Sequence, residues 1–232
     1  SLLGYLGSKR LLVILDNFEH LLEGAGIVAE ILKNSPSAHL LVTSRERLQL
    51  QEEQVFPIQG LEFPDWEAPQ DPSEYTAMAL FVQSAQRLQP GFRLDSEDMV
   101  YLTRICNLVG GMPLGLELAA SWVDVLSLEE IATEIKTSID FLETEVRNVP
   151  QRHRSIRAVF DSSWNRLSAT EQNIFPRLSI FRGTFTREAA QKVAQASLRD
   201  LATFTSKSLL QYDQTTHRYQ IHELLRQYGA ER

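Results

Sequence analysis

The chain has 232 residues and carries 30 Asp and Glu against 23 Lys and Arg, which gives a formal net charge of -7, and 43% of its residues are hydrophobic. This composition is typical of a soluble globular protein and allows one large domain or two to three small ones. The acidity argues against a nucleic-acid coat, which needs clustered Lys and Arg, and no apolar run approaches the ~18 residues of a membrane span.

The single cysteine, Cys106, cannot form an internal disulfide, which fits a reducing compartment, and we expect a cytoplasmic protein. The first ten residues lack the charged leader and apolar stretch of a signal peptide. Because the sequence begins with Ser1 and not with Met, we also expect it to be a piece of a longer protein.

The first sixty residues predict a strand, a helix and a second strand. A continuous apolar run at 11–15 contains β-branched residues and favours a strand buried on both faces over a buried helix. A helical pattern follows from Glu19 to Lys33, and a second short apolar run stands at 39–43. This order predicts a right-handed βαβ unit in a parallel sheet, with a third short strand at 54–58.

Prolines and acidic residues between 60 and 72 mark a predicted domain boundary, and a helical bundle is expected beyond it. Asp71, Asp95 and Ser127 are placed to cap its helices. Gly110-Gly111 is placed to end one helix and Pro113 to begin the next.

Beyond Pro150 four further helices are predicted, beginning near Ile156, Ser168, Thr186 and Leu198. Two short segments, 209–212 and 218–221, then flank a polar turn and predict a β-hairpin. Three helices followed by a hairpin are the layout of a winged helix.

Polar side chains follow both predicted parallel strands. Asp16 follows the first strand, and a carboxylate at the carboxyl end of such a strand can hold the Mg²⁺ of a nucleotide. Glu19 can polarise an attacking water, and Arg45, after the second strand, can pair with a terminal phosphate. The structural alternatives are a helix-capping Asp16, a Glu19 favoured by the helix dipole and a surface Arg45.

Two positions further along the chain also have two interpretations. Pro113 is explained by a helix end followed by a helix start, but its ring can also form a rigid wall against a base. His222 stands just after the predicted hairpin. A histidine there is usually structural, and its functional interpretation is a contact to a phosphate.

Several kinds of site have no sequence signal. The five histidines are scattered and Cys106 is alone, so a zinc site is not expected. No Gly-x-Ser-x-Gly segment supports acyl transfer. No Gly-x-x-x-x-Gly-Lys followed by Ser or Thr occurs, so nothing in this sequence is predicted to cradle phosphates.

Four segments nevertheless occur in a specific order. They are Leu-Leu-Val-Ile-Leu-Asp-Asn-Phe-Glu-His (11–20), Leu-Leu-Val-Thr-Ser-Arg-Glu (40–46), Gly-Gly-Met-Pro-Leu-Gly-Leu-Glu-Leu-Ala-Ala (110–120) and Ile-His-Glu-Leu-Leu (221–225). Their order and spacing resemble the signal-transducing STAND NTPases, which include the NB-ARC proteins. The residues of these segments are most similar to those of the bacterial ATP-binding transcriptional regulators of the AfsR and LuxR-like kinds.

This resemblance implies an overall organisation for the chain. The fold class would be the α/β remnant of a P-loop NTPase parallel sheet at 1–60, an all-α helical lid at 66–146 and a winged-helix domain at 147–232, predominantly helical overall. The cofactor would be ATP or ADP with Mg. The partners would be a downstream sensor or repeat domain and, in the open form, further copies of the protein, with no membrane.

The resemblance also implies roles at the matching positions. Asp16 would be the Walker-B carboxylate that holds magnesium, and Arg45 the arginine that senses the γ-phosphate. Pro113 would be the proline of the Gly-x-Pro motif, near the adenine. His222 would match the histidine of the Met-His-Asp motif, which holds the β-phosphate of ADP in the closed, resting state.

The chain departs from the family pattern in ways that affect function. Asn17 stands where many relatives carry a second acid, so either Glu19 acts as the base or hydrolysis is slow, and Glu223 replaces the usual Asp. The P-loop and its strand, which precede the Walker-B strand in this family, are missing. We therefore expect the chain alone to be inactive as an enzyme. We also expect residues 1–58 to be its least stable part, with an open edge and an uncovered apolar face.

Two other functions compete with the nucleotide switch, namely a winged helix that binds DNA and an interaction module that does not depend on nucleotide. The DNA hypothesis is based on a stripe of basic and aromatic residues, Arg147, Arg152, His153, Arg154, Arg157, Trp164 and Arg166. We interpret this stripe as a solvated or interdomain face, and prefer the switch.

Overall fold

The computed structural model describes residues 5–6, 9–64, 74–144 and 154–232. By its internal contacts the chain divides into two compact units. The first comprises Ser1–Pro57 with Ala202–Leu209, and the second Ile58–Leu201 with Leu210–Arg232.

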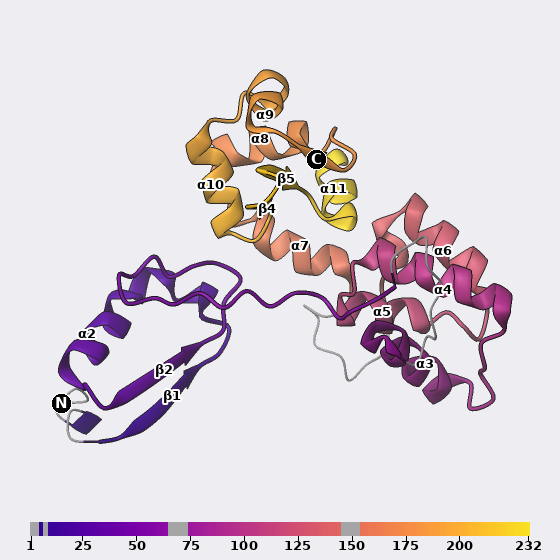
Figure 1. Ribbon diagram of the computed structural model, residues 1–232, viewed down its shortest axis with the longest axis horizontal. Coiled ribbons are helices and arrows are strands. Elements are labelled where there is room, and N and C mark those ends of the chain that lie inside the picture. Colours follow the sequence, from indigo (N-terminus) through magenta and orange to yellow (C-terminus); the bar gives the residue numbers. More distant parts are fainter. Residues whose placement is uncertain (1–4, 7–8, 65–73, 145–153) are drawn as a thin grey trace. The chain divides into compact units, whose positions relative to one another are not determined.

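The first unit is built on a two-stranded parallel sheet with one helix beside it (Figure 1). Its elements are β1 (Leu11–Leu15), the 3-10 helices η1 (Phe18–His20) and η2 (Leu22–Gly24), α2 (Gly26–Asn34) and β2 (Ala38–Val42). The two strands pair in register from Leu11 opposite Ala38 to Leu15 opposite Val42. The predicted parallel strand–helix–strand unit is thereby confirmed.

One face of this sheet is covered and the other is not. Phe18, Ala25 and Val28 are buried against the covered face, with partly buried leucines and valines around them. On the opposite face Leu12 and Ile14 are 62% and 61% exposed and Leu41 is 53% exposed. The expectation that so small a sheet leaves an apolar face uncovered is confirmed.

Two predictions for this unit were wrong in detail. The helix expected from Glu19 begins only at Gly26, and residues 18–24 form 3-10 turns instead, where Gly24 lowers the helix propensity. The segment 54–58, predicted as a third strand, pairs with no strand in the described part of the chain. Pro57 lacks a backbone donor there, and Phe56 and Ile58 are 88% and 87% exposed.

The first half of the second unit is helical, as predicted. Its elements are α3 (Thr76–Leu88), α4 (Ser96–Val109), α5 (Pro113–Ala120), α6 (Leu128–Thr137) and the 3-10 helix η4 (Ile139–Phe141). Helices α3 and α4 pack on α5 and α6, and the fully buried core includes Met78, Phe81, Leu102, Ile105, Leu116, Ile131 and Ile135. We refer to residues 74–144 as the helical part.

The predicted helix ends are formed in the helical part. Asp95 accepts hydrogen bonds from the backbone N–H of residues 97 and 98, both at 2.8 Å, in a capping box. Ser127 and Glu130 form a second capping box at the start of α6. Gly110 ends α4 in the left-handed conformation, and Pro113 is the first residue of α5. The predicted cap Asp71 lies outside the described residues.

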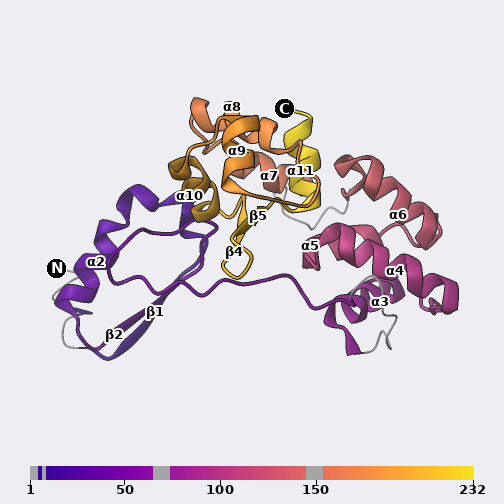
Figure 2. The ribbon, with the colours of Figure 1, turned by 45° about the horizontal axis from the view of Figure 1, so that its top comes forward.

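The chain from residue 154 to residue 232 combines helices with a small antiparallel sheet, and we refer to its second-unit residues, 154–201 and 210–232, as the C-terminal part. The elements of residues 154–232 are α7 (Ile156–Trp164), α8 (Ala169–Leu178), β3 (Thr184–Phe185), α9 (Arg187–Ala194), α10 (Leu198–Ser206), β4 (Gln211–Asp213), β5 (Arg218–Gln220) and α11 (Glu223–Ala230). The four predicted helices and the β4–β5 hairpin are confirmed, and the turn of the hairpin projects from the group of helices (Figure 2).

The sheet has the strand order β3-β5-β4, so β3 adds a strand that the sequence did not predict. Aromatic rings run across it. The centroids of Phe181 and Phe185 are 4.5 Å apart, those of Phe185 and Tyr219 6.0 Å, and those of Tyr219 and Tyr212 4.9 Å. The two contacts of Tyr219 join neighbouring strands, and such cross-strand aromatic contacts stabilise a sheet whose strands are only two or three residues long.

Candidate functional site

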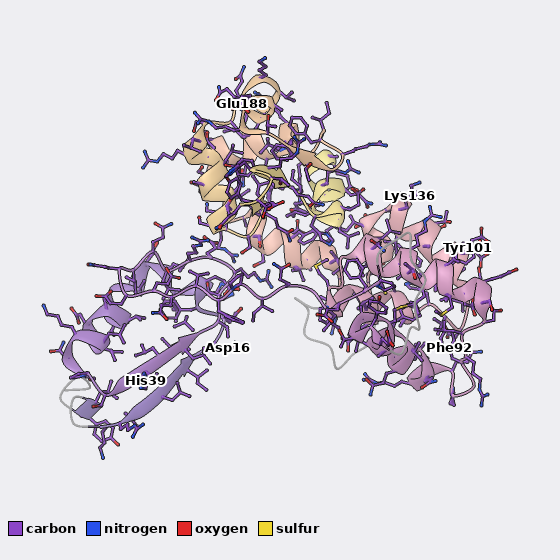
Figure 3. All side chains as sticks on the ribbon, viewed as in Figure 1. Asp16, His39, Phe92, Tyr101, Lys136 and Glu188 are labelled. Atoms are coloured by element: carbon purple, nitrogen blue, oxygen red, sulfur yellow. The ribbon has the colours of Figure 1, made fainter. Side chains whose placement is uncertain are left out.

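The predicted magnesium carboxylate, Asp16, lies at the carboxyl end of β1 (Figure 3). Because β1 and β2 are parallel, the residues that follow them meet at one edge of the sheet. There the Thr43 hydroxyl donates to Asp16 Oδ1 at 2.5 Å and accepts from the backbone N–H of Asn17 at 2.9 Å. Asp16 is exposed, so its carboxylate is oriented by Thr43 and still accessible to a cation.

Glu19 and Arg45 meet at the same edge. Glu19 is 5% exposed, and its Oε1 lies 3.4 Å from Nε of Arg45, whose side chain is 33% exposed. The carboxylate predicted as a base and the guanidinium predicted as a phosphate sensor are therefore paired with each other. Since a partly buried ion pair is broken only at a cost, a phosphate would have to compete with Glu19 for Arg45.

In the second unit the turn after α4 is crossed by a second backbone segment. Gly110 and Gly111 both have positive φ, 58° and 65°. The N–H of Leu61 donates to the carbonyl of Gly111 at 2.8 Å. A Cβ on Gly60 would lie 2.2 Å from the Gly110 oxygen, and one on Gly111 would lie 2.1 Å from the Leu61 oxygen. Glycine is required here because two main chains touch.

His222 closes the other side of this turn. An added Cβ on Gly110 would lie 2.1 Å from His222 Nε2, so the imidazole rests directly on the glycine backbone. His222 is also the N-cap of α11, where its Nδ1 accepts from the N–H of Leu224 at 3.2 Å. That bond places the ring proton on Nε2, which is buried, and no acceptor among the described residues meets full hydrogen-bond geometry there, although the Val109 carbonyl faces the ring.

Burial lowers the pKa of His222 below its ordinary value of 6.5, although the Val109 carbonyl and the Glu223 carboxylate act in the opposite direction. The imidazole is therefore neutral at pH 7 and carries an enclosed N–H donor. The neighbouring Glu223 does not share this donor, because its two oxygens accept from Arg226 at 2.7 and 2.8 Å.

The structure thus assembles the predicted site residues in two groups. Asp16, Glu19 and Arg45 lie together in the first unit. In the second unit Pro113 is exposed at the start of α5, three residues after the Gly110 backbone on which His222 rests.

Sequence reasoning missed Thr43 as the partner of Asp16, and it missed the segment at Gly60 and Leu61. The signal for Thr43 was its position, because it directly follows β2 in the same way that Asp16 directly follows β1.

The basic stripe is only partly described. Arg147, Arg152 and His153 lie outside the described residues. Arg157 binds the carboxylates of Asp140 and Glu231. Because two carboxylates already compensate the positive charge of this guanidinium, the interdomain interpretation of Arg157 is favoured over a phosphate contact.

Within the described ranges no group of three His, Cys, Asp or Glu is placed to hold a metal ion. None of the described helices combines the length and apolarity that crossing a membrane requires.

No protein-family model matches the chain. Over its full length the chain is 34% identical to proteins called "Putative HTH-type transcriptional regulator" in Mycobacterium bovis and Mycobacterium tuberculosis, in alignments of 242 residues. It is 30% identical, over 83% of its length, to an uncharacterized protein of Mycobacterium tuberculosis. The chain spans only 26% of the length of the two regulators and 47% of the third protein.

Among solved structures, the chain aligns with a STAND protein with a tetratricopeptide repeat sensor from Pyrococcus horikoshii. That alignment has 15% identity and a TM-score of 0.30, and covers 99% of this chain and 29% of the other. The sequence similarity therefore places the whole chain alongside one segment of much longer proteins that bear the name of transcriptional regulators.

Proposed function

We propose that this chain is the nucleotide-responsive switch segment of a larger, cytoplasmic transcriptional regulator of the STAND class. In the resting state the protein would hold ADP in a closed form, and exchange for ATP with Mg²⁺ would favour an open form that assembles with further copies. The similarity to named regulators supports the regulatory role. The nucleotide dependence rests on the residues described above.

The observation that carries the proposal is the enclosed N–H of His222 on the Gly110 backbone. The Val109 carbonyl faces this donor without meeting good hydrogen-bond geometry, so the N–H is only partly satisfied and is a candidate for a ligand contact. A phosphate oxygen is a suitable acceptor for a neutral imidazole N–H. The exposed Pro113 ring, in the same turn region, would contact the adenine.

The first-unit residues suit a magnesium-bound phosphate. Asp16, oriented by Thr43, would hold Mg²⁺, and Arg45 would exchange its contact with Glu19 for the γ-phosphate. Magnesium bound there would supply charge neutralisation at the phosphates. If Glu19 orients water, it must first leave Arg45, which suits a slow switch in which the bound nucleotide carries the information.

The test is ADP binding by the full-length protein, followed by isothermal titration calorimetry. His222→Ala is expected to weaken ADP binding about tenfold or more, the range for losing a hydrogen bond to a charged group. His39→Ala is the matched control, because His39 is an exposed histidine on β2. The same affinity in all three proteins, or no ADP binding by the wild type, would favour an interaction module without nucleotide dependence.

The gene provides a second test. If the protein binds nucleotide as proposed, a strand followed by Gly-x-x-x-x-Gly-Lys and Ser or Thr should be encoded upstream of the codon for Ser1, within roughly 100 codons. Sequencing this region decides whether the site described here has a phosphate-cradling loop to complete it.

A further inference from the structure

The helical part and the C-terminal part of the second unit are joined by backbone pairing. The N–H of Thr144 donates to the carbonyl of Arg154 at 2.7 Å, and the N–H of Ile156 donates to the carbonyl of Leu142 at 3.1 Å. Ser155, in this pairing, also caps α7 by accepting from the N–H of Ala158. The start of α7 is therefore fixed on the segment that follows η4, and we call this pairing the joint.

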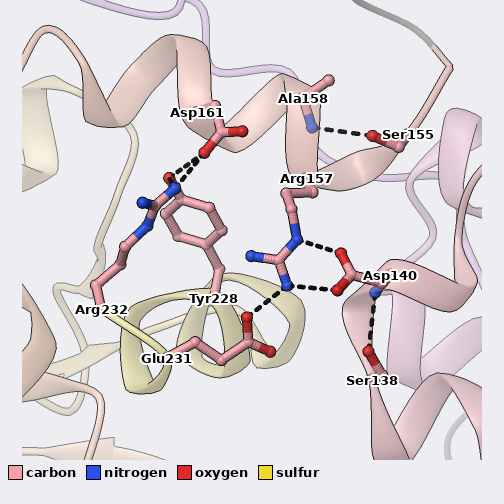
Figure 4. Close-up of polar contacts among 9 residues, drawn as sticks. All are labelled: Ser138, Asp140, Ser155, Arg157, Ala158, Asp161, Tyr228, Glu231 and Arg232. Carbon is pink, nitrogen blue, oxygen red and sulfur yellow. Dashed lines mark hydrogen bonds and ion pairs between the residues drawn. The ribbon is translucent and has the colours of Figure 1, made fainter.

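Directly beside the joint, Arg157 binds one carboxylate from the helical part and one from the C-terminal part (Figure 4). Its Nε and Nη2 form a two-pronged contact with Asp140 of the helical part, and Nη2 also contacts Glu231 at the end of α11. The contact with Asp140 raises the pKa of Arg157, so the guanidinium stays charged. A planar guanidinium bound at two points fixes orientation as well as distance.

Helix α11 belongs firmly to the C-terminal part. The Tyr228 hydroxyl donates to Asp161 of α7 at 2.6 Å, and Arg232 binds both of these groups. Gly229 packs so closely on α8 that a Cβ there would lie 2.1 Å from Ser179 Oγ. Because these contacts already hold α11 to α7, the bond from Arg157 to Glu231 is redundant for that attachment.

Helix α11 also packs on α4 and η4 of the helical part, but its hydrogen bonds there are weak. Gln227 Nε2 lies 3.5 Å from two carbonyls at the end of α6, which is the limit for a hydrogen bond. At the opposite end of α11 from Glu231, His222 rests on Gly110. One end of the helix thus lies at the joint and the other at the candidate site.

We propose that the two-pronged contact between Arg157 and Asp140, the fork, sets the angle at which the C-terminal part packs on the helical part. This angle would control access of solvent and ligands to His222. Glu231 stands nine positions after His222 in the sequence, which is about 13 Å along a helix. A rotation of about 10° at the joint therefore moves the His222 end by about 2 Å, enough to admit water to Nε2. The proposal concerns the regulation of the site in the proposed function, and its test needs no nucleotide.

The test measures how fast diethyl pyrocarbonate modifies His222, read by peptide mass spectrometry and expressed relative to the exposed His39. Wild-type His222 should react slowly because Nε2 is enclosed. Asp140→Asn should raise its rate about three- to fivefold, as expected for loss of a partly exposed ion pair. Glu231→Gln is the matched control. It removes the negative charge of the other carboxylate that Arg157 binds, and it leaves the contact between Arg157 and Asp140 in place.

The single thiol separates opening from unfolding. Cys106 is fully buried in α4, and burial raises its pKa to about 12, so it should stay unreactive toward a thiol reagent while the helical part is folded. A rise in His222 reactivity with an unreactive Cys106 supports the proposal. No rise in Asp140→Asn, or an equal rise in Glu231→Gln, overturns it.

If Asp140→Asn exposes Cys106 as well, this variant is partly unfolded. The salt dependence of His222 modification in the wild type then tests the proposal. Raising the salt from about 0.05 to about 0.5 M screens the ion pair and should speed His222 modification with Cys106 still unreactive, whereas a flat response overturns the proposal. Arg157→Lys, which keeps the charge and loses the planar fork, should give an intermediate rate. Failure of ADP binding would leave these outcomes unchanged, so the two proposals fail separately.

Discussion

Gly110 combines a left-handed backbone with a direct contact to His222. We predict that Gly110→Ala lowers the free energy of unfolding by about 2–4 kcal/mol, because alanine is strained at φ 58° and its Cβ must also displace the imidazole. Urea unfolding followed by circular dichroism measures this change.

Two other glycines provide matched controls for that substitution. Gly183 has φ 94° with nothing within 4 Å of an added Cβ, so Gly183→Ala isolates the backbone strain. Gly91 has an ordinary φ and equally open surroundings, so Gly91→Ala should be close to neutral. If Gly110→Ala costs no more than Gly183→Ala, His222 does not pack on the turn as described.

The enclosed imidazole of His222 also has a consequence for stability against pH. Because burial lowers the pKa of His222 in the folded chain, the unfolded chain takes up its proton at a higher pH. The contribution of His222 to the free energy of unfolding is therefore fully present above the ordinary pKa of 6.5. It falls as the pH is lowered through that value, until folded His222 is protonated as well. Urea unfolding at about pH 7.5 and about pH 5.5 should show a larger loss in the wild type than in His222→Gln. An equal loss in both would contradict the burial of Nε2.

Helix α6 allows its cap to be tested against its interior. Ser127→Ala removes the hydroxyl that accepts from the N–H of Glu130, and we expect a loss of about 1 kcal/mol in the free energy of unfolding. Thr133 lies in the middle of the same helix, and its hydroxyl only bonds back to the carbonyl of Glu129. Thr133→Ala should be neutral or slightly stabilising, because alanine is the better helix former. Chemical unfolding of both variants makes the comparison.

The elements that the sequence predicted well have strong local signals. Capping boxes, Gly110 and the apolar runs of β1 and β2 depend on neighbouring residues, and all of them are formed. The segment 54–58 was wrongly predicted because a strand also needs a partner, and local pattern does not show whether one is available. The two-residue strand β3 is too short to produce a pattern.

The candidate site shows the same division between local and distant information. The positions of Asp16 and Arg45 at strand ends were predictable from apolar runs alone. Their partners, Thr43 and Glu19, depend on the parallel register and on the turn at Asn17, which has φ 60°. The contact of His222 with Gly110 joins positions 112 residues apart, and only the tertiary structure reveals it.

Across the whole chain, the two units should differ in stability. The first unit has a small core and leaves Leu12, Ile14 and Leu41 exposed, whereas the second has many fully buried side chains. We predict that amides of β1 and β2 exchange with solvent faster than those of α4 and α8, because local opening is easier where few apolar contacts are lost. Hydrogen exchange with mass spectrometry measures this, and equal protection in both units would refute the prediction.

The joint between residues 142–144 and 154–156 also determines where the chain tolerates a change in length. Its two backbone hydrogen bonds hold the ends of the intervening segment together whatever that segment contains. The entropy of closing a loop between fixed ends depends only weakly on loop length, and doubling the length adds only about 0.6 kcal/mol. A reporter peptide inserted between residues 144 and 154 should therefore leave the neighbouring elements in register. The same insertion between Gly110 and Pro113 would separate the two backbones that touch there.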